Sequence, residues 1–300
     1  MTRPVRTIKV SVISDDIASS RSLKAGVIWL VDREVHVLAG AKLTIEDGAR
    51  IRILNGLVPS STRLRRAALI FDPGSKLNAE SFSVCAAHAN GRAARTADNG
   101  GLWFLGASDA GASDGLEVVM STEKTASEYK AVSIAVSYLG RKDPLAGSQE
   151  NCDDIDAIKL LGVGRHEWNV SRVRSLHSAD DGLDLTNSQV RMDRVEIIAP
   201  GEDCINLSSS RLEIRRSMHL DLRKTEYGDR DLFDFETDDG ASTVELPAGC
   251  WIRVKGVFGD QLSLASPEMP PPDTSDDNQV DYSFRGRLTK DAIVYSVSRD

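Results

Sequence analysis

Four aspartates in the second half of the chain each lead a short apolar segment, and their spacing is the feature best suited to chemistry. They are Asp156, Asp181, Asp203 and Asp231. Each begins the pattern Asp-x-apolar-x-apolar, and the steps between them are 25 (181−156), 22 (203−181) and 28 (231−203) residues. Asp180 and Glu202 place a further acid directly before two of them. Carboxyl groups held close together cannot all ionise freely, so one can keep its proton as a general acid while others act as bases.

A second apolar phrase runs between these aspartates at the same scale. It begins at Trp168, Val190 and Leu212, and both steps are 22 residues (190−168 and 212−190). Strand-like phrases that recur together every 20 to 30 residues or so are typical of a solenoid of stacked coils. Equivalent residues of adjacent coils then lie about 4.8 Å apart. The repeat therefore predicts that the four leading aspartates form one row, with Asp184 and Asp234 projecting from the same strands.

The remaining sequence also favours strands. Residues 27–56 alternate apolar and polar side chains between glycines, which is typical of short strands joined by tight turns. No long amphipathic helix is evident, and residues 122–131 allow at most a short one. Beyond residue 240 the repeat fades. We therefore predict an all-β parallel solenoid over residues 1–240 and a small β-rich cap over residues 241–300 that covers its open end.

Composition argues against several classes of function. The formal net charge of −8 disfavours nucleic acid as a partner and disfavours adsorption to an anionic membrane. The four cysteines lie far apart, which argues against a zinc site of ordinary spacing and against a disulfide framework. No segment approaches the length of a membrane span, and the N-terminus lacks the apolar stretch of a signal peptide. The expectation is a cytoplasmic protein, or a secreted one whose leader has been removed. The oligomeric state stays open.

Segments of the first half resemble bacterial surface and lipoprotein-type β-helix proteins. The likeness lies in residues 35–51, 68–77 and 101–106, and it continues into Leu161-Gly-Val-Gly164 and Ser178-Ala-Asp-Asp-Gly182. It covers residues 25–240 at most. The resemblance implies a right-handed parallel β-helix and implies little about activity.

Two coils of the second half are similar to the active-site coils of polygalacturonase-type glycoside hydrolases. Residues 179–184 (Ala-Asp-Asp-Gly-Leu-Asp) resemble that family's Asn-Thr-Asp-Gly-Ile-Asp, and residues 201–205 (Gly-Glu-Asp-Cys-Ile) resemble its Gly-Asp-Asp-Cys-Ile. The resemblance implies that Asp181 and Asp203 activate water and that Glu202 stands where the general acid stands. The family's Gly-His-Gly and Arg-Ile-Lys motifs are absent from this chain.

Other polar residues are candidates for binding a substrate near these acids. They are Asp184, His177, His219, Arg223 and Lys224. Three arginines at the 22-residue step, Arg172, Arg194 and Arg216, predict a second ladder. This ladder could hold an anionic sugar, or it could be a solvated face paired with nearby acids. Each histidine has the same two readings, as a proton carrier or as an ordinary surface side chain.

Three functions follow from these expectations. The leading one is recognition of a polysaccharide, with hydrolysis by Asp181, Glu202 and Asp203, which requires no cofactor. The alternative is a non-catalytic adhesin or scaffold whose aspartates bind Ca²⁺ or accept hydrogen bonds from turn amides. A second alternative is a polysaccharide lyase, which would need Ca²⁺ and a basic residue, with Arg223 or Lys224 as the candidates.

Overall fold

The computed structural model describes residues 9–59, 66–107, 126–142, 155–222, 230–237, 240–259, 261–272 and 281–296. Within these ranges every regular element is a β-strand, and the strands form two sheets. The all-β prediction with parallel strands is thereby confirmed. The described residues contain no helix that is long and apolar enough to cross a membrane.

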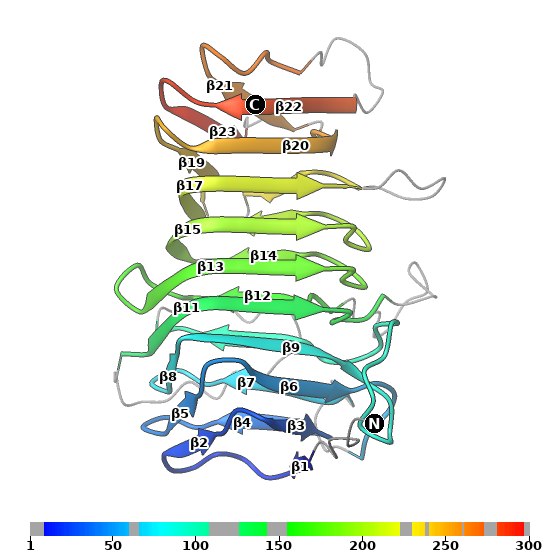
Figure 1. Cartoon of the computed structure of the whole chain (residues 1–300). Coiled ribbons are helices and arrows are strands. Elements are labelled where there is room, and N and C mark those ends of the chain that lie inside the picture. The colour runs from blue at the N-terminus through cyan, green and yellow to red at the C-terminus, as the bar shows by residue number, and fades with distance from the viewer. Residues whose placement is uncertain are drawn as a thin grey trace, which may run out of the picture.

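The smaller sheet is entirely parallel. Its order is β18-β16-β14-β12-β10-β7-β4, so each strand lies beside the sheet's next strand along the chain. The strands are β4 (Glu34–Val37), β7 (Ala68–Phe71), β10 (Leu102–Leu105), β12 (Ile158–Leu161), β14 (Leu183–Thr186), β16 (Ile205–Ser208) and β18 (Phe233–Glu236). Figure 1 shows these strands behind the larger sheet, which faces the viewer.

The larger sheet is parallel from β1 to β17 and bends around the stack. Its main strands are β1 (Lys9–Ile13), β3 (Val27–Val31), β6 (Ala49–Leu54), β9 (Ser81–Ala87), β11 (Glu128–Ser137), β13 (Trp168–Leu176), β15 (Gln189–Ile198) and β17 (Arg211–Asp221). Three short strands pair beside them: β2 (Arg21–Leu23), β5 (Lys42–Ile45) and β8 (Lys76–Ala79). Because β11 pairs with both β8 and β9, one long strand replaces two short ones from there onward.

The short helix allowed at residues 122–131 is wrong in its described part. Residues 128–131 open β11, where Tyr129 pairs with Leu77 on one side and with Trp168 on the other. The Tyr129 ring is fully buried and meets Phe71 and Phe104 edge to face, with ring centroids 5.9 and 5.1 Å apart. Pairing on both edges and burial of this ring outweigh the weak local preference for a helix.

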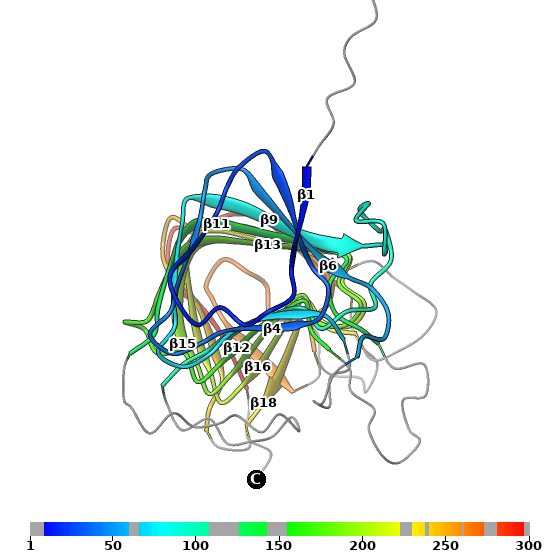
Figure 2. The ribbon, with the colours of Figure 1, turned by 90° about the horizontal axis from the view of Figure 1, so that it is seen from below.

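The chain alternates between the two sheets, and the apolar side chains between them form one continuous core. Viewed along the stack, β9, β11 and β13 lie over one another on one side and β4, β12, β16 and β18 on the other (Figure 2). Trp168 belongs to this core. Trp103 is also buried, but it lies on the other face of the smaller sheet, in a second apolar cluster with Ile70 and Leu161.

Buried serines form a ladder at the corners where the chain leaves β14 and β16 for the larger sheet. The Ser188 hydroxyl donates to the Leu160 carbonyl at 3.1 Å, and the Ser210 hydroxyl donates to the Leu185 carbonyl at 2.9 Å. Each hydroxyl also accepts from the coil before it: the Val163 amide donates to Ser188 Oγ at 3.0 Å, and the Ser188 amide donates to Ser210 Oγ at 2.9 Å. These bonds satisfy backbone groups that the turn would otherwise bury unpaired.

The end of the chain changes from parallel to antiparallel pairing. β19 (Thr243–Leu246) and β20 (Trp251–Val257) still pair parallel with β17. The last three strands, β21 (Leu262–Ala265), β22 (Asp281–Arg287) and β23 (Ala292–Ser296), make only antiparallel pairs. Figure 1 shows them at the C-terminal end of the stack. Parallel pairing thus continues past residue 240, and the division into two domains there stays a prediction.

Candidate functional site

The four leading aspartates lie in one row along the edge of the smaller sheet. Each stands two residues before a strand, ahead of β12, β14, β16 and β18. These strands pair in register, so the turns before them also stack. The Ala157 amide donates to the Asp181 carbonyl at 3.1 Å, the Gly182 amide to the Asp203 carbonyl at 2.9 Å, and the Cys204 amide to the Asp231 carbonyl at 3.0 Å. The row expected from the repeat is therefore present.

Two carboxylates of this row hold the backbone of the next coil. The Asp203 amide donates to Asp181 Oδ1 at 2.9 Å, and the Asp231 amide donates to Asp203 Oδ1. Short acidic side chains often accept hydrogen bonds from turn amides in this way. One oxygen of Asp181 and one of Asp203 thus serve the fold, and the second oxygen of each carboxyl is left for other interactions.

Burial raises the pKa of both of these acids. Asp181 is 5% exposed, and burial followed by the negative charges of Asp156 and Asp203 raises its pKa well above the ordinary value. Asp203 is 8% exposed, and burial raises its pKa to about 8, with nearby acids adding to the effect and the Asp231 amide opposing it. Desolvation disfavours the charged form of a carboxyl. Asp203 therefore tends to keep a proton at neutral pH, and Asp181 keeps its proton to a higher pH than an ordinary aspartate does.

Glu202 behaves in the opposite way. Its side chain is 28% exposed, and Lys142 Nζ lies 3.1 Å from Oε2. Burial alone would raise the pKa of Glu202, but hydrogen bonds with Asp180 and Lys142 and the positive charge of Lys142 and Arg230 lower it overall. An ionised carboxylate thus stands next in sequence to a carboxyl that keeps its proton.

A buried lysine accompanies the acids on β12. Lys159 pairs in register with Trp103 on one side and with Asp184 on the other. Its Nζ lies 3.6 Å from Asp156 Oδ2 and 3.6 Å from Asp184 Oδ1, and 5.7 Å from the Trp103 ring centroid. All four side chains are buried. Lys159 thus places positive charge beside two buried acids.

Three carboxylates near this lysine could hold a metal ion. Asp156, Asp181 and Asp184 each offer an oxygen, and these oxygens lie within 4.8 Å of one another. Ca²⁺ takes carboxylate oxygens of this kind. Because Lys159 already pairs with two of the three, a cation would have to displace its ammonium group.

The other candidate substrate-binding residues are dispersed. His177 directly follows β13 with φ 53° and stacks on Tyr138, with ring centroids 5.0 Å apart and planes 19° apart. His219 lies in β17 of the larger sheet, where its Nδ1 is 3.6 Å from Glu196 Oε1. Arg223 and Lys224 lie outside the described residues.

The predicted arginine ladder is wrong at its third member. Arg172 and Arg194 pair in register, but Arg194 then pairs with Ser217. The register shifts between Met192 and Arg194, as in a β-bulge. At this irregularity Arg216 turns to Asp193 instead, with its Nε 3.4 Å from Oδ2.

A second charged cluster, which the sequence did not suggest, surrounds His36 on β4. Its Nδ1 lies 2.7 Å from Asp72 Oδ1 and its Nε2 lies 3.0 Å from Glu34 Oε1. Burial lowers the pKa of His36, but the hydrogen bonds with these two carboxylates and their charge raise it to about 10. Glu34 and His36 occur as a close pair in the sequence, whereas only the pairing of β4 with β7 brings Asp72 to them.

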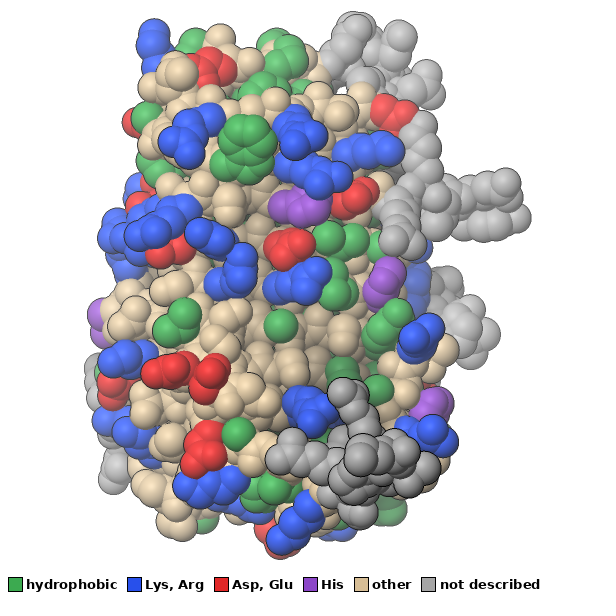
Figure 3. All heavy atoms as spheres, in the orientation of Figure 1, with side chains coloured by type: hydrophobic (Ala, Val, Ile, Leu, Met, Phe, Trp, Pro, Cys, Tyr) green, Lys and Arg blue, Asp and Glu red, His purple; other side chains and the backbone are tan. Residues whose placement is uncertain are grey.

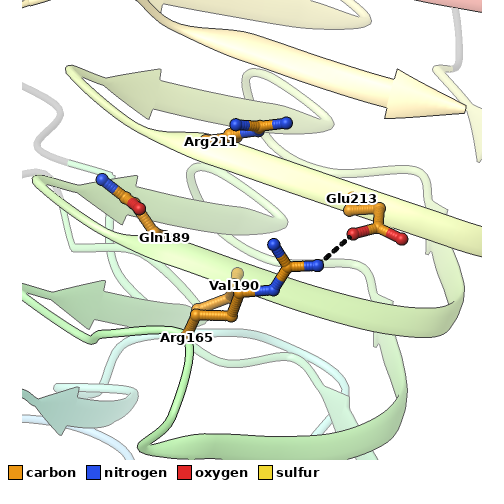
Figure 4. Close-up of a pocket in the computed structure, with 5 residues that line it drawn as sticks. All are labelled: Arg165, Gln189, Val190, Arg211 and Glu213. Atoms are coloured by element: carbon orange, nitrogen blue, oxygen red, sulfur yellow. Dashed lines mark hydrogen bonds and ion pairs between the residues drawn. The ribbon is translucent and has the colours of Figure 1, made fainter.

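A small surface pocket lies away from the aspartates. It is lined by Arg165, Gln189, Val190, Arg211 and Glu213, and it includes no member of the aspartate row. Figure 4 shows Arg165 reaching from a turn to Glu213 on β17, with Arg165 Nη2 2.8 Å from Glu213 Oε2.

Comparison with known proteins finds no matching family model, no similar curated protein and no similar solved structure. The function has to be argued from the arrangement of the side chains themselves.

Proposed function

We propose that the protein is a right-handed parallel β-helix that recognises a polysaccharide and hydrolyses it at Asp181, Glu202 and Asp203. The parallel pairing of each strand with its equivalent about 22 residues along supports the solenoid. A solenoid presents a long continuous surface, which suits an extended polymer. Its stacked turns also bring Asp181 next to Asp203, and Glu202 directly precedes Asp203 in the chain.

The observation that carries the proposal is the contrast in protonation between Glu202 and Asp203. Asp203 keeps a proton because its pKa is raised to about 8, while the pKa of Glu202 is lowered. Two carboxyls whose environments push their pKa values apart are suited to act as general acid and general base. In this assignment Asp203 protonates the leaving sugar oxygen and Glu202 activates water, which reverses the roles that the resemblance implies.

Asp181 acts in this scheme as a positioning residue. Its Oδ1 accepts the Asp203 amide, so it fixes the backbone that carries the proposed general acid. Its own raised pKa disfavours a negative charge beside Asp203.

The test is release of reducing ends from a panel of neutral and acidic polysaccharides, with and without chelator. Asp203→Asn keeps an oxygen that accepts the Asp231 amide but loses the titrating proton, so it should abolish release while the melting temperature at about pH 5 stays unchanged. Asp193→Asn, on the larger sheet, is the matched control and should leave release unchanged. Full activity in Asp203→Asn would refute the assignment. Chelator should have no effect, because the mechanism uses no metal.

A second candidate function, a non-catalytic adhesin or scaffold, is favoured by the hydrogen bonds that Asp181 and Asp203 make to the next coil. In that case no polysaccharide would be cleaved. A melting temperature that falls with chelator would then favour Ca²⁺ among the aspartates. A lyase would instead create unsaturated products in a Ca²⁺-dependent reaction, and Arg223→Ala with Lys224→Ala would abolish them.

A further inference from the structure

Arginines and one tryptophan gather on the outer face of the larger sheet near its C-terminal end. Strand pairing places Arg172, Arg194, Ser217, Trp251 and Arg287 in one row across five strands. In the neighbouring row, Arg253 of β20 lies opposite Arg285 of β22. Figure 3 shows Lys and Arg side chains gathered over β20 and the strands beside it. We call these six side chains the Trp251 face: Arg172, Arg194, Trp251, Arg253, Arg285 and Arg287.

The arginines of the Trp251 face differ from the other arginines of β13, β15 and β17, each of which has an acidic partner. All five are exposed, and within the described part of the chain none of them forms an ion pair. The neighbouring arginines are paired with acids, as Arg174 is with Glu196 at 3.0 Å and Arg211 with Glu245 at 2.5 Å. Like charges placed directly opposite one another across strands destabilise a sheet. An uncompensated arrangement of this kind indicates an anionic partner.

Trp251 gives the face an aromatic platform. Its residue surface is 41% exposed, and the Arg285 guanidinium carbon lies 6.0 Å from its ring centroid. Ser217, the neighbour of Trp251 in the row, has a small side chain. An exposed indole offers a flat apolar surface to a sugar ring, while arginine forks bind carboxylate or sulfate oxygens.

We propose that the Trp251 face binds an anionic polysaccharide, carboxylated or sulfated, along the row from Arg172 to Arg287. The choice of a polysaccharide rests on the proposed function, and the charge of the polymer rests on the unpaired arginines. Single-stranded nucleic acid fits less well, because proteins that bind it stack successive bases on several aromatics, and the Trp251 face has one. The net charge of −8 on the whole chain also opposes a nucleic acid partner.

The experiment compares two double variants that remove the same charge. Arg253→Ser with Arg285→Ser removes two facing arginines, and Arg165→Ser with Arg211→Ser removes two ion-paired arginines near the pocket. Binding is measured by affinity electrophoresis and calorimetry with alginate, dextran sulfate, neutral dextran and a single-stranded oligonucleotide. Trp251→Ala is measured beside them. Each variant also carries Asp203→Asn, so that cleavage cannot obscure binding.

The protein with only Asp203→Asn should bind alginate or dextran sulfate, and the binding should weaken as salt rises. The first double variant should bind about tenfold less tightly or worse, because it loses two charge-assisted contacts. It should melt no lower than its parent, because two facing like charges have been removed. Trp251→Ala should weaken binding, and the control pair should bind like the parent.

Equal affinity in the two double variants would refute the proposal that the Trp251 face binds an anionic polysaccharide, and so would preferential binding of the oligonucleotide. Binding of neutral dextran as tight as that of the anionic polymers would refute the face while leaving polysaccharide recognition intact. Failure to bind any of the glycans would refute both proposals.

Discussion

Replacing Asp203 with Asn is expected to remove much of the dependence of the unfolding free energy on pH above about pH 4. The buried carboxyl has its pKa raised from 3.8 to about 8 in the folded protein. Between these values the folded state keeps a proton that the unfolded state has lost. The stability that this proton provides is fully present below about pH 4 and is lost as pH rises through about 8.

The size of the effect follows from the two pKa values. Each pKa unit corresponds to about 1.4 kcal/mol, so a difference of about four units bounds the effect at roughly 6 kcal/mol. From about pH 5 to about pH 8 the wild-type protein should lose about 4 kcal/mol of unfolding free energy through this group. Asn has the shape of the protonated acid, keeps an oxygen for the Asp231 amide and does not titrate. The variant should match wild type near pH 5 and exceed it near pH 8.

The assay is urea unfolding followed by tryptophan fluorescence at these two pH values. Asp193→Asn is the control, because Asp193 is a partly exposed acid of the larger sheet that pairs with Arg215 and Arg216. The control should keep the wild-type pH dependence. An Asp203→Asn protein that loses stability with pH as steeply as wild type would refute the reasoning. A variant destabilised equally at both pH values would show that Asp203 is ionised in the folded state.

Three further perturbations follow from the same structure. Lys159→Met should destabilise the fold by about 3–5 kcal/mol, because it removes the positive charge beside two buried acids; thermal melts should then show greater stabilisation by Ca²⁺ than wild type shows, and equal responses would contradict the proposed competition. Ser210→Ala should lower the unfolding free energy by about 1–3 kcal/mol, because the Ser188 amide loses its buried acceptor; an unchanged urea midpoint would argue against the serine ladder. The pKa of His36 is raised to about 10, so the stability that this residue contributes is fully present below about pH 6.5 and is lost as pH rises through about 10. His36→Gln should therefore flatten the dependence of the unfolding free energy on pH over that window, as measured by urea unfolding. An unchanged dependence would exclude the double ion pair.

The row of leading aspartates could be predicted from the sequence because the repeat is short and regular. The 22 residues from Asp181 to Asp203 form one coil, with one strand in each sheet. The two residues therefore become neighbours whatever their side chains are. Parallel pairing and the buried apolar positions follow from the same period. The resemblance to other proteins, by contrast, found no support in the comparisons.

Local irregularities could not be predicted from the repeat. The register shift between β15 and β17 moves Arg216 out of line with Arg194, and the 22-residue step does not predict this shift. Ser210 ends a run of three serines, and only the corner geometry shows which hydroxyl is buried. Asp72 lies 36 residues from His36 in the sequence, so no short motif contains both residues.

The protonation of the candidate site could not be read from the sequence either. Glu202 and Asp203 are adjacent acids, yet their pKa values move in opposite directions because one is half-buried beside Lys142 and the other lies under the turn. Burial and charge neighbours decide this, and both depend on how the coils stack.

Carboxyl carbon NMR titration of labelled Asp and Glu tests the proposed acid–base pair most directly. The resonance that disappears in Asp203→Asn should titrate near pH 8, and the resonance that disappears in Glu202→Gln should titrate below the ordinary value of a glutamate. Titration of Asp203 near pH 4, the ordinary range for an aspartate, would contradict the account.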